Sequence, residues 1–531
     1  MKNLSCLAIL LIICSLVSAS DRYHRYLNLD VLHYEFTVGL SDSADIITGR
    51  TVIDLKVLGK TDSIGLDLKG MNIQGKGMKV EEVSLNGKNI KWKQGMERLM
   101  VFPDKPVSDD DTIKLIINYH GIPADGLIIS RNKYGDRTFF ADHWPDRAGN
   151  YLPCIDHPYD KATVDFLITA PERYEVVANG IMIEESDLEG NMKLTHWKEQ
   201  IPIPVKVMTF GVARFAVKYE GEADKIPVWS WVFPQNRLEG FKDYSIALKP
   251  LRFYSSLIGD YPYEKLANVQ SKTIYGGLEN AGAIFYAENS VTGLGNAERL
   301  IAHEIAHQWF GDCVTEADWY HIWLSEGFAT YLTSLYIESV YGRQQLLSDM
   351  ANTRTRVIKY SEKHTKPVID TTITNLMDLL STNSYQKGGW ILHMLRCETG
   401  DESFIKGLRL YYDRFKNSNA LSSDFQQAME EASGQDLNAF FRQWLYVAGQ
   451  PELKIWNKAI KKTGTTDIYI EQEQDHLFEF NLELLVKGTS GERVEMIHVR
   501  DRLTKFNVQS ANVTTITPDP NVKLLFKLHT Q

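Results

Sequence analysis

The sequence predicts a multidomain α+β protein in which two β-rich regions flank a mainly helical one. The chain has 531 residues, which is too many for a single hydrophobic core. Apolar and polar residues alternate in the first part of the chain and again after Pro451, whereas helical periods dominate between these parts. We therefore expect a β domain over residues 20–217, a helical domain over 218–450 and a small β-sandwich over 451–531.

The first residues differ from the rest of the chain. Lys2 precedes an apolar stretch over residues 7–13, and small residues follow it up to Ala19. A charged start, a short apolar segment and a small-residue cleavage site are typical of a secretory signal peptide. We predict that residues 1–19 form a cleaved signal and that the protein is exported, to a periplasm or out of the cell. An uncleaved anchor is the alternative, but the stretch is short for crossing a bilayer, and we expect no membrane span in the mature chain.

Composition excludes some classes of protein. The net charge is −10 and no basic block occurs, so binding to nucleic acid is not expected. Of the five cysteines, Cys154, Cys313 and Cys397 lie outside the predicted signal and are widely spaced. This spacing indicates neither a disulfide framework nor a thiolate zinc site, and we expect three buried free thiols.

Individual segments support the β assignment of the first part. Residues 52–57 alternate, and the Asn86-Gly87 pair is the one favoured in tight hairpins. Residues 163–168 indicate a further strand.

The middle of the chain is expected to be helical. Residues 331–341 continue a helix, and a capping residue at Ser423 is expected to begin another. An amphipathic segment over residues 436–447 ends before Gly449 and Pro451. Alternation then returns at residues 468–471 and 478–482, as expected for a β-sandwich.

The strongest chemical signal is the segment His303-Glu304-Ile305-Ala306-His307. Residues four apart on a helix differ by about 40° around its axis, so both imidazoles project from one face. Two such nitrogens can bind one zinc ion, with Glu304 beside them as general base. The alternative is an ordinary helix with two surface histidines.

A catalytic zinc ion usually has three protein ligands and one open position. Glu326 is the candidate third ligand, because the eighteen residues between His307 and Glu326 allow a turn and a second, antiparallel helix. Apolar and aromatic neighbours, including Trp323, indicate that Glu326 is buried, and a buried carboxylate without a partner is unfavourable.

These motifs resemble those of the gluzincin zinc aminopeptidases, the family of aminopeptidase N and leukotriene hydrolase. Upstream, Gly276-Gly277-Leu278-Glu279-Asn280 is similar to the exopeptidase signature of that family, with Leu278 in place of Met. Downstream, Tyr385-Gln386-Lys387-Gly388 is similar to its Tyr-x-Lys-Gly motif. The resemblance extends from about residue 30 to the end of the chain.

The resemblance implies a fold and an activity. The fold would be an N-terminal β-sandwich or saddle domain, a thermolysin-like catalytic domain and a C-terminal β-sandwich, without the helical domain that follows in many relatives. The activity would be removal of amino acids from peptides with a free amino terminus, with one zinc ion per chain.

The resemblance also implies roles for residues outside the zinc motif. Gly276, Gly277 and Asn280 would belong to the edge strand that binds the substrate backbone. Glu279 would bind the α-ammonium group, and Tyr385 would donate its hydroxyl to the oxyanion. A tyrosine packed on Trp390 is the alternative for Tyr385.

Some positions depart from the family. Relatives carry a second Glu or Gln for the substrate amine where this chain has Trp144, and Asp142 could supply the charge from a shifted loop. His321 and Ser325 replace residues that are often acidic and Asn. We expect His321 to pack near the site rather than bind the metal, because a fourth ligand would fill the open position.

Other functions remain open at this stage. An endopeptidase or an epoxide hydrolase would use the same zinc chemistry. A binding protein that retains the fold without turnover is a further alternative, although every residue of the zinc motif is present.

Overall fold

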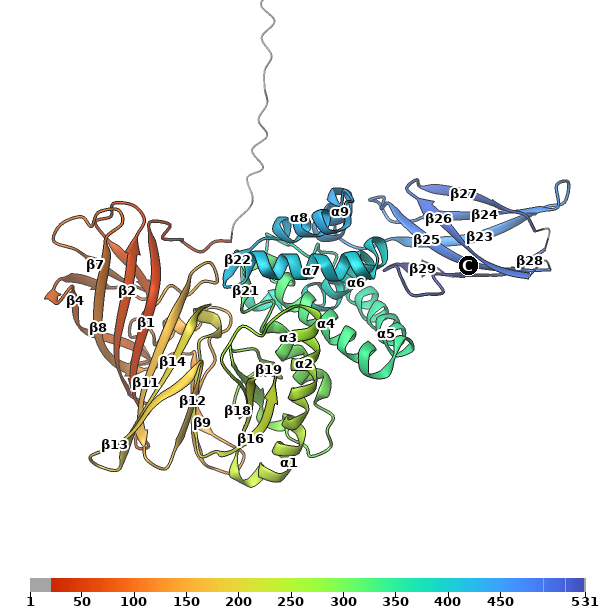
Figure 1. Cartoon of the computed structure of the whole chain (residues 1–531). Coiled ribbons are helices and arrows are strands. Elements are labelled where there is room, and N and C mark those ends of the chain that lie inside the picture. Colours follow the sequence, from red (N-terminus) through yellow and green to blue (C-terminus); the bar gives the residue numbers. More distant parts are fainter. Residues whose placement is uncertain (1–20, 490, 511, 530–531) are drawn as a thin grey trace, which may run out of the picture.

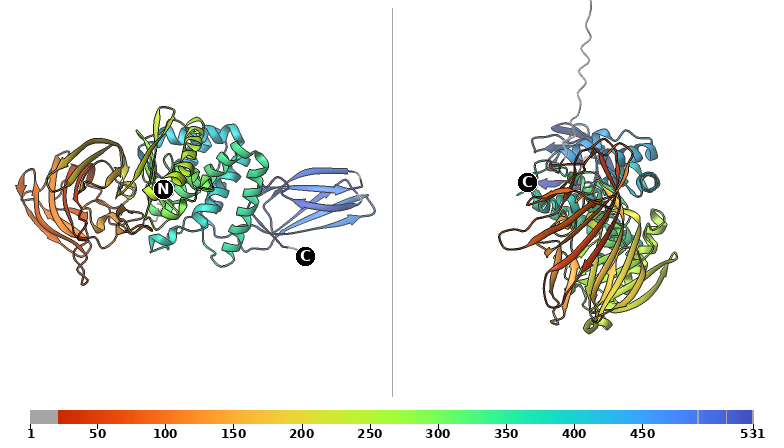
Figure 2. Two further views of the ribbon diagram at one scale, coloured as in Figure 1. Left: turned by 90° about the horizontal axis from the view of Figure 1, so that it is seen from below. Right: turned by 90° about the vertical axis from the view of Figure 1, so that its left-hand side faces the viewer.

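The computed structural model describes residues 21–489, 491–510 and 512–529, so the predicted signal peptide lies outside the described residues. Three parts follow one another in a row: an N-terminal β part, a central helical part and a C-terminal β part (Figures 1 and 2). The predicted fold class is thereby confirmed. Within the described ranges, no helix is both long and apolar enough to cross a membrane.

The N-terminal part is built on an eight-stranded sheet in the order β13-β14-β11-β1-β2-β8-β4-β5. Its strands are β1 (Leu29–Gly39), β2 (Ile47–Val57), β4 (Gly77–Leu85), β5 (Lys88–Asn89), β8 (Thr112–Ile122), β11 (Lys161–Pro171), β13 (Ile181–Leu188) and β14 (Met192–Pro204). The first strand, β1, lies inside this sheet, antiparallel to β2 and parallel to β11.

Two smaller sheets complete this part. One contains β3 (Ile64–Asp67), β7 (Arg98–Phe102) and β6 (Lys91–Gln94), and the other contains β12 (Glu175–Ala178), β15 (Phe210–Ala213), β10 (Arg137–Ala141) and β9 (Leu127–Arg131). The predicted hairpin joins β4 to β5. Asn86 and Gly87 have φ values of 48° and 78°, the positive pair that a two-residue hairpin turn requires.

The central part opens with a five-stranded sheet in the order β16-β17-β18-β20-β19. Its strands are β16 (Ala216–Ala223), β17 (Ile226–Val232), β18 (Leu266–Ser271), β20 (Ala283–Ala287) and β19 (Gly277–Leu278). β19 is an edge strand, paired only with β20 in this sheet.

The described part of the chain contains nine α-helices (Figure 1). They are α1 (Arg237–Tyr244), α2 (Leu248–Leu257), α3 (Glu298–His307), α4 (Trp323–Tyr341), α5 (Arg343–Ser361), α6 (Gly388–Thr399), α7 (Asp401–Phe415), α8 (Ser422–Ser433) and α9 (Asn438–Tyr446). Of these, α1, α2 and α3 contact the five-stranded sheet. A short sheet of β21 (Val314–Glu316) and β22 (Ser418–Ala420) joins the loop after α3 to the segment before α8.

The start of α8 differs from the prediction. The helix begins at Ser422, and Leu421 rather than Ser423 occupies the capping position. The Asp424 carboxylate accepts a hydrogen bond from the Leu421 amide at 2.7 Å. The capping side chain therefore belongs to the first turn of the helix and not to the residue before it.

The C-terminal part contains two sheets that face each other and whose strands are mostly antiparallel. One contains β27 (Leu503–Val508), β24 (Thr465–Gln472), β23 (Glu452–Ile460) and β29 (Lys527–His529), and the other contains β26 (Gly491–Val499), β25 (Phe480–Gly488) and β28 (Val513–Pro518). Leu453, Ile470, Leu482 and Leu484 are buried in this part, which is the predicted small β-sandwich.

All three cysteines of the described chain are free thiols. Cys154 and Cys313 are buried as predicted, whereas Cys397 is only half-buried because it lies near the end of α6.

Buried polar contacts join the N-terminal part to the central part. Lys206 forms a fully buried ion pair with Glu316 at 2.5 Å. Lys161 donates hydrogen bonds to the carbonyls of Asp312 and Cys313 at 3.0 and 2.7 Å. These contacts fix the loop that follows α3, the helix that ends at His307.

Candidate metal centre and active-site cavity

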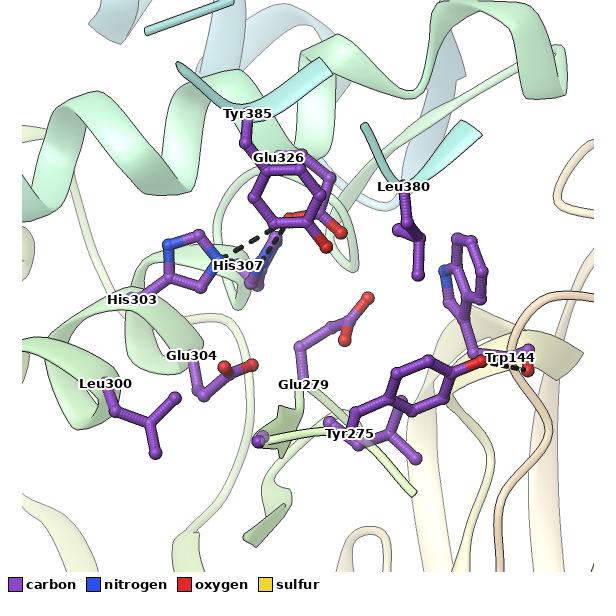
Figure 3. Close-up of a pocket in the computed structure, with 13 residues that line it drawn as sticks. Trp144, Tyr275, Glu279, Leu300, His303, Glu304, His307, Glu326, Leu380 and Tyr385 are labelled. Atoms are coloured by element: carbon purple, nitrogen blue, oxygen red, sulfur yellow. Dashed lines mark hydrogen bonds and ion pairs between the residues drawn. The ribbon is translucent and has the colours of Figure 1, made fainter. Parts of the chain in front are cut away.

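Three potential metal ligands converge from two helices. His303 and His307 lie one turn apart on α3, and Glu326 lies in the first turn of α4. Figure 3 shows the Glu326 carboxylate pointing between the two imidazoles. The Nε2 atoms are 3.2 Å apart, and each is 3.4 Å from Oε2 of Glu326.

This triangle has the dimensions of a zinc site. A tetrahedral zinc ion bound at about 2.0–2.2 Å keeps its protein donors about 3.3–3.5 Å apart, close to the three distances found here. Oε2 of Glu326 is buried and has no hydrogen-bond partner within the described chain. The donor set therefore fits one zinc ion, which would satisfy this oxygen.

Neighbouring side chains orient these donors. Ser325 Oγ lies 2.9 Å from Nδ1 of His307, which directs Nε2 of that ring toward the candidate metal position. Gly311 makes room for this contact, because a Cβ there would lie 2.3 Å from Ser325 Oγ. Burial disfavours the ionised form of Glu326, but the two imidazoles outweigh it and hold its pKa well below the usual value.

The carboxylate of Glu304 faces the same cavity, which measures about 250 Å³. Burial, with the charges of Glu279 and Glu326, raises the pKa of Glu304 well above its usual value, although His307 opposes the shift. Gly277 packs directly against Glu304: a Cβ at Gly277 would lie 2.3 Å from its Oε1. A side chain at position 277 would therefore displace the Glu304 carboxylate from its place in the cavity.

The exopeptidase-like segment lies across the cavity from the imidazoles. Gly276, Gly277 and Glu279 line the cavity. Glu279 is buried and its Oε1 has no hydrogen-bond partner in the described residues. Oxygens of Glu279 and Glu304 and a nitrogen of His307 lie within 4.8 Å of one another.

Asn280 does not line the cavity. Asn280 follows Glu279 in the sequence and its side chain is buried. Its carbonyl accepts a hydrogen bond from the Ala283 amide at 3.0 Å. The backbone before it is held by Gln308, whose Nε2 donates to the carbonyl of Glu279 at 2.8 Å. No sequence pattern indicates this role for Gln308, although it follows His307 directly.

Tyr385 enters the cavity from a π-helical turn, η8 (Asn383–Lys387). Its ring stacks on the imidazole of His303 with centroids 5.9 Å apart, whereas the ring of Trp390 contacts that of His393. Burial raises the pKa of Tyr385 well above its usual value, and the charge of Glu326 adds to the shift. The hydroxyl therefore stays protonated and available as a donor.

Two glycines explain how Tyr385 comes so close to Glu326. Gly327 follows Glu326 on α4, and Gly388 starts α6 directly after η8. A Cβ on either glycine would lie 2.9 Å from the Cα of the other. The last residue of the Tyr-x-Lys-Gly motif is therefore glycine because two backbones meet there.

Of the two candidate positions for a second amine-binding residue, Trp144 lines the cavity and Asp142 does not. Asp142 is fully buried, ion-paired with Arg147, and accepts hydrogen bonds from Thr273 Oγ1 and the Ile274 amide at 3.0 and 3.3 Å. Asp142 thus fixes the loop before β19 and does not line the cavity. Trp144 does line it, beside Tyr275 (Figure 3).

His321 lies outside the donor set. Its Nδ1 is 2.8 Å from Ser422 Oγ, and its ring packs between α4 and the start of α8. It is absent from the group of residues that can hold a metal ion with His303.

Two histidines one turn apart, a glutamate that follows the first of them and a glutamate from the next helix define a metallopeptidase of the gluzincin class. Family comparison agrees: residues 244–444 match the peptidase family M1 domain, and residues 30–205 match the peptidase M1 N-terminal domain. The chain belongs to peptidase family M1.

Similar proteins carry aminopeptidase names. A probable aminopeptidase 2 of Sulfurisphaera tokodaii is 26% identical over 76% of this chain and 52% of its own length. A leucyl aminopeptidase of Saccharolobus solfataricus is 27% identical over 71% of this chain and 50% of its own. The chain thus spans about half the length of the curated relatives it matches.

A crystal structure of an M1 zinc metallopeptidase mutant from Deinococcus radiodurans is also similar. It matches with a TM-score of 0.70 and 25% identity, over 80% of this chain and 96% of that chain.

Proposed function

We propose that this protein is a zinc-dependent aminopeptidase that removes amino acids from the free amino terminus of peptides. The observation that carries the proposal is that one cavity contains the three-donor set, the Glu304 carboxylate and the buried, partly unpartnered Glu279 carboxylate. The aminopeptidase names of the relatives support it. One zinc ion per chain would be held by His303, His307 and Glu326.

When bound, zinc would polarise the scissile carbonyl and lower the pKa of the attacking water. Glu304, whose ionised form would be favoured by the positive charge of bound zinc, accepts a proton from that water and delivers it to the leaving amine. Tyr385 donates its hydroxyl to the oxygen on which negative charge develops. The free edge of β19 at Gly277, with Gly276 directly before it, pairs with the substrate backbone.

Glu279 decides between an aminopeptidase and an endopeptidase. A buried carboxylate oxygen without a partner is unfavourable unless a cation binds beside it, and the α-ammonium group of a peptide supplies that cation. An internal peptide bond brings no such charge. We therefore favour the exopeptidase, with Trp144 and Leu278 as apolar walls near the first side chain.

A panel of aminoacyl arylamides tests this function. We expect hydrolysis that a chelator abolishes and that added zinc restores. The same compounds with an acetylated amine should be nearly inert, because the acetyl group removes the charge that Glu279 binds. Equal rates for free and acetylated compounds would favour an endopeptidase, and bound zinc without any hydrolysis would favour a binding protein.

We also propose that the protein is exported and acts in a periplasm or outside the cell. The support is the signal-like pattern of residues 1–19. Mass spectrometry of the protein recovered from expressing cells should give an amino terminus that follows Ala19. An intact Met1 on the exported protein would contradict cleavage.

A further inference from the structure

A second cavity adjoins the first beyond His303. It measures about 490 Å³ and shares Leu300, His303 and Tyr385 with the first cavity. In Figure 3, Leu300 lies on the side of Glu304 away from Glu279. We call this second cavity the α3–α5 groove, because residues of α3, α4 and α5 line it.

The direction of a bound peptide follows from these positions. If its amino group lies at Glu279 and its first carbonyl at the metal ligands, the residues after the scissile bond continue past His303 and Leu300. They then enter the α3–α5 groove, which the first cavity meets at these side chains.

The α3–α5 groove contains one positive charge that no acidic side chain offsets. Arg299 is paired with Asp349 at 2.7 Å. Arg356 on α5 is exposed and forms no ion pair or hydrogen bond with any residue in the described ranges. Apart from these residues and His303, the lining is uncharged and includes Thr330 and Asn352.

The two cavities therefore carry opposite charges, since Glu279 lines one and Arg356 lines the other. We propose that Arg356 binds a carboxylate on the part of the substrate that follows the scissile bond, so that the protein prefers peptides with a negative group there. This inference rests on the proposed aminopeptidase function.

Two sources can supply that carboxylate: the carboxyl terminus of a short peptide, or an acidic side chain of a longer one. Arginine suits either source, since its planar guanidinium can donate two parallel hydrogen bonds to a carboxylate. Because the guanidinium is exposed, water and salt weaken the contact, and its effect is moderate.

The experiment compares the zinc-loaded wild-type protein with Arg356→Gln on four substrates that share one amino-terminal residue. These are an arylamide, a tripeptide with a free carboxyl terminus, the same tripeptide amidated, and an amidated tripeptide with aspartate at its last position. We expect Arg356→Gln to lower kcat/KM about three- to tenfold for the peptide whose carboxylate binds at Arg356. This is the size of effect expected for the loss of one exposed charge-assisted hydrogen bond. The arylamide and the neutral tripeptide should be unaffected.

Matched variants complete the design. Arg356→Lys retains the charge and should recover part of the preference, whereas Arg237→Gln, an exposed arginine on α1 outside both cavities, should change nothing. The preference for the carboxylate should also fall as salt is raised. A loss confined to the free tripeptide assigns the carboxyl terminus as ligand, and a loss confined to the aspartate peptide assigns the side chain.

Two results would overturn the inference, and they differ. If the wild-type protein hydrolyses the arylamide but Arg356→Gln treats all three peptides as the wild type does, Arg356 does not bind substrate. If the wild-type protein hydrolyses none of the four compounds, the aminopeptidase function fails and this inference fails with it.

Discussion

At the scale of single residues, the cavity separates metal binding from acid–base chemistry. His303, His307 and Glu326 form one triangle, whereas Glu304 projects from the same turn of α3 toward β19. A substitution can therefore remove the base and retain the ligands.

Glu304→Gln should retain zinc and lose most of its turnover, because the amide keeps the shape of the side chain but cannot accept a proton. Zinc content and kcat on an arylamide are the measurements. His303→Ala is the comparison, and it should lose metal as well as activity. Undiminished kcat in Glu304→Gln would exclude Glu304 as the general base.

Tyr385→Phe should lower kcat about 10²- to 10³-fold with little change in KM, since its hydrogen bond forms mainly as charge develops in the transition state. Tyr341→Phe serves as a control, because its hydroxyl donates to Glu298 at 2.6 Å and lies outside the cavity. An equal loss in both variants, or a change in KM alone, would contradict the oxyanion role.

At the scale of elements, glycine contacts set the distances between functional side chains. β19 approaches α3 at Gly277, and α4 meets α6 at Gly327 and Gly388. A methyl group at Gly277 would displace the Glu304 side chain, and one at Gly327 or Gly388 would require a shift of backbone.

Gly388→Ala should therefore reduce activity while zinc stays bound. The added Cβ would lie 2.9 Å from the Cα of Gly327, so α6 must move away from α4 and carry Tyr385 with it. We expect a lower kcat and a lower Tm. Gly59→Ala should be neutral, since its Cβ would meet Asn28 at an ordinary 3.6 Å. Full activity in Gly388→Ala would show that the turn tolerates the shift.

The elements also show what the sequence could and could not predict. The two imidazoles and Glu326 were predictable, because helical geometry and chain spacing dictate their convergence. The sheet beside α3 was not predictable from the sequence. Its strand β18 is buried on both faces, so it lacks the alternation of apolar and polar residues that marks a half-buried strand. Whether Asp142 or Trp144 faces the cavity depends on the direction of a loop, which no periodicity encodes.

At the scale of the whole molecule, stability should depend on pH through a buried carboxyl group that does not line the active-site cavity. Asp160 precedes β11, and its Oδ1 accepts a hydrogen bond from the Val31 amide of β1 at 3.3 Å, while Oδ2 has no partner in the described chain. Burial raises the pKa of Asp160 to about 8.

The pKa of Asp160 is higher in the folded protein than in the unfolded chain. Between these two pKa values, the folded protein keeps a proton on this carboxyl group that the unfolded chain has already lost. Stability therefore decreases as pH rises toward 8, by at most about 1.4 kcal/mol per pH unit. Asp160→Asn should have a Tm close to that of the wild type at pH 5 and a higher Tm at pH 8. Asp104→Asn, at an exposed position, should show no such trend. A difference in Tm that does not vary with pH would contradict the assignment.

The place of β1 has a consequence for the order of events during synthesis. This strand leaves the ribosome early, yet one of its two partners, β11, begins only at Lys161. A nascent chain can form the hairpin of β1 and β2, but one edge of β1 stays unpaired until more than a hundred further residues have emerged. Such an open edge can recruit strands from other chains, so chaperones that shield extended segments should raise the yield of this protein more than those that act on compact intermediates.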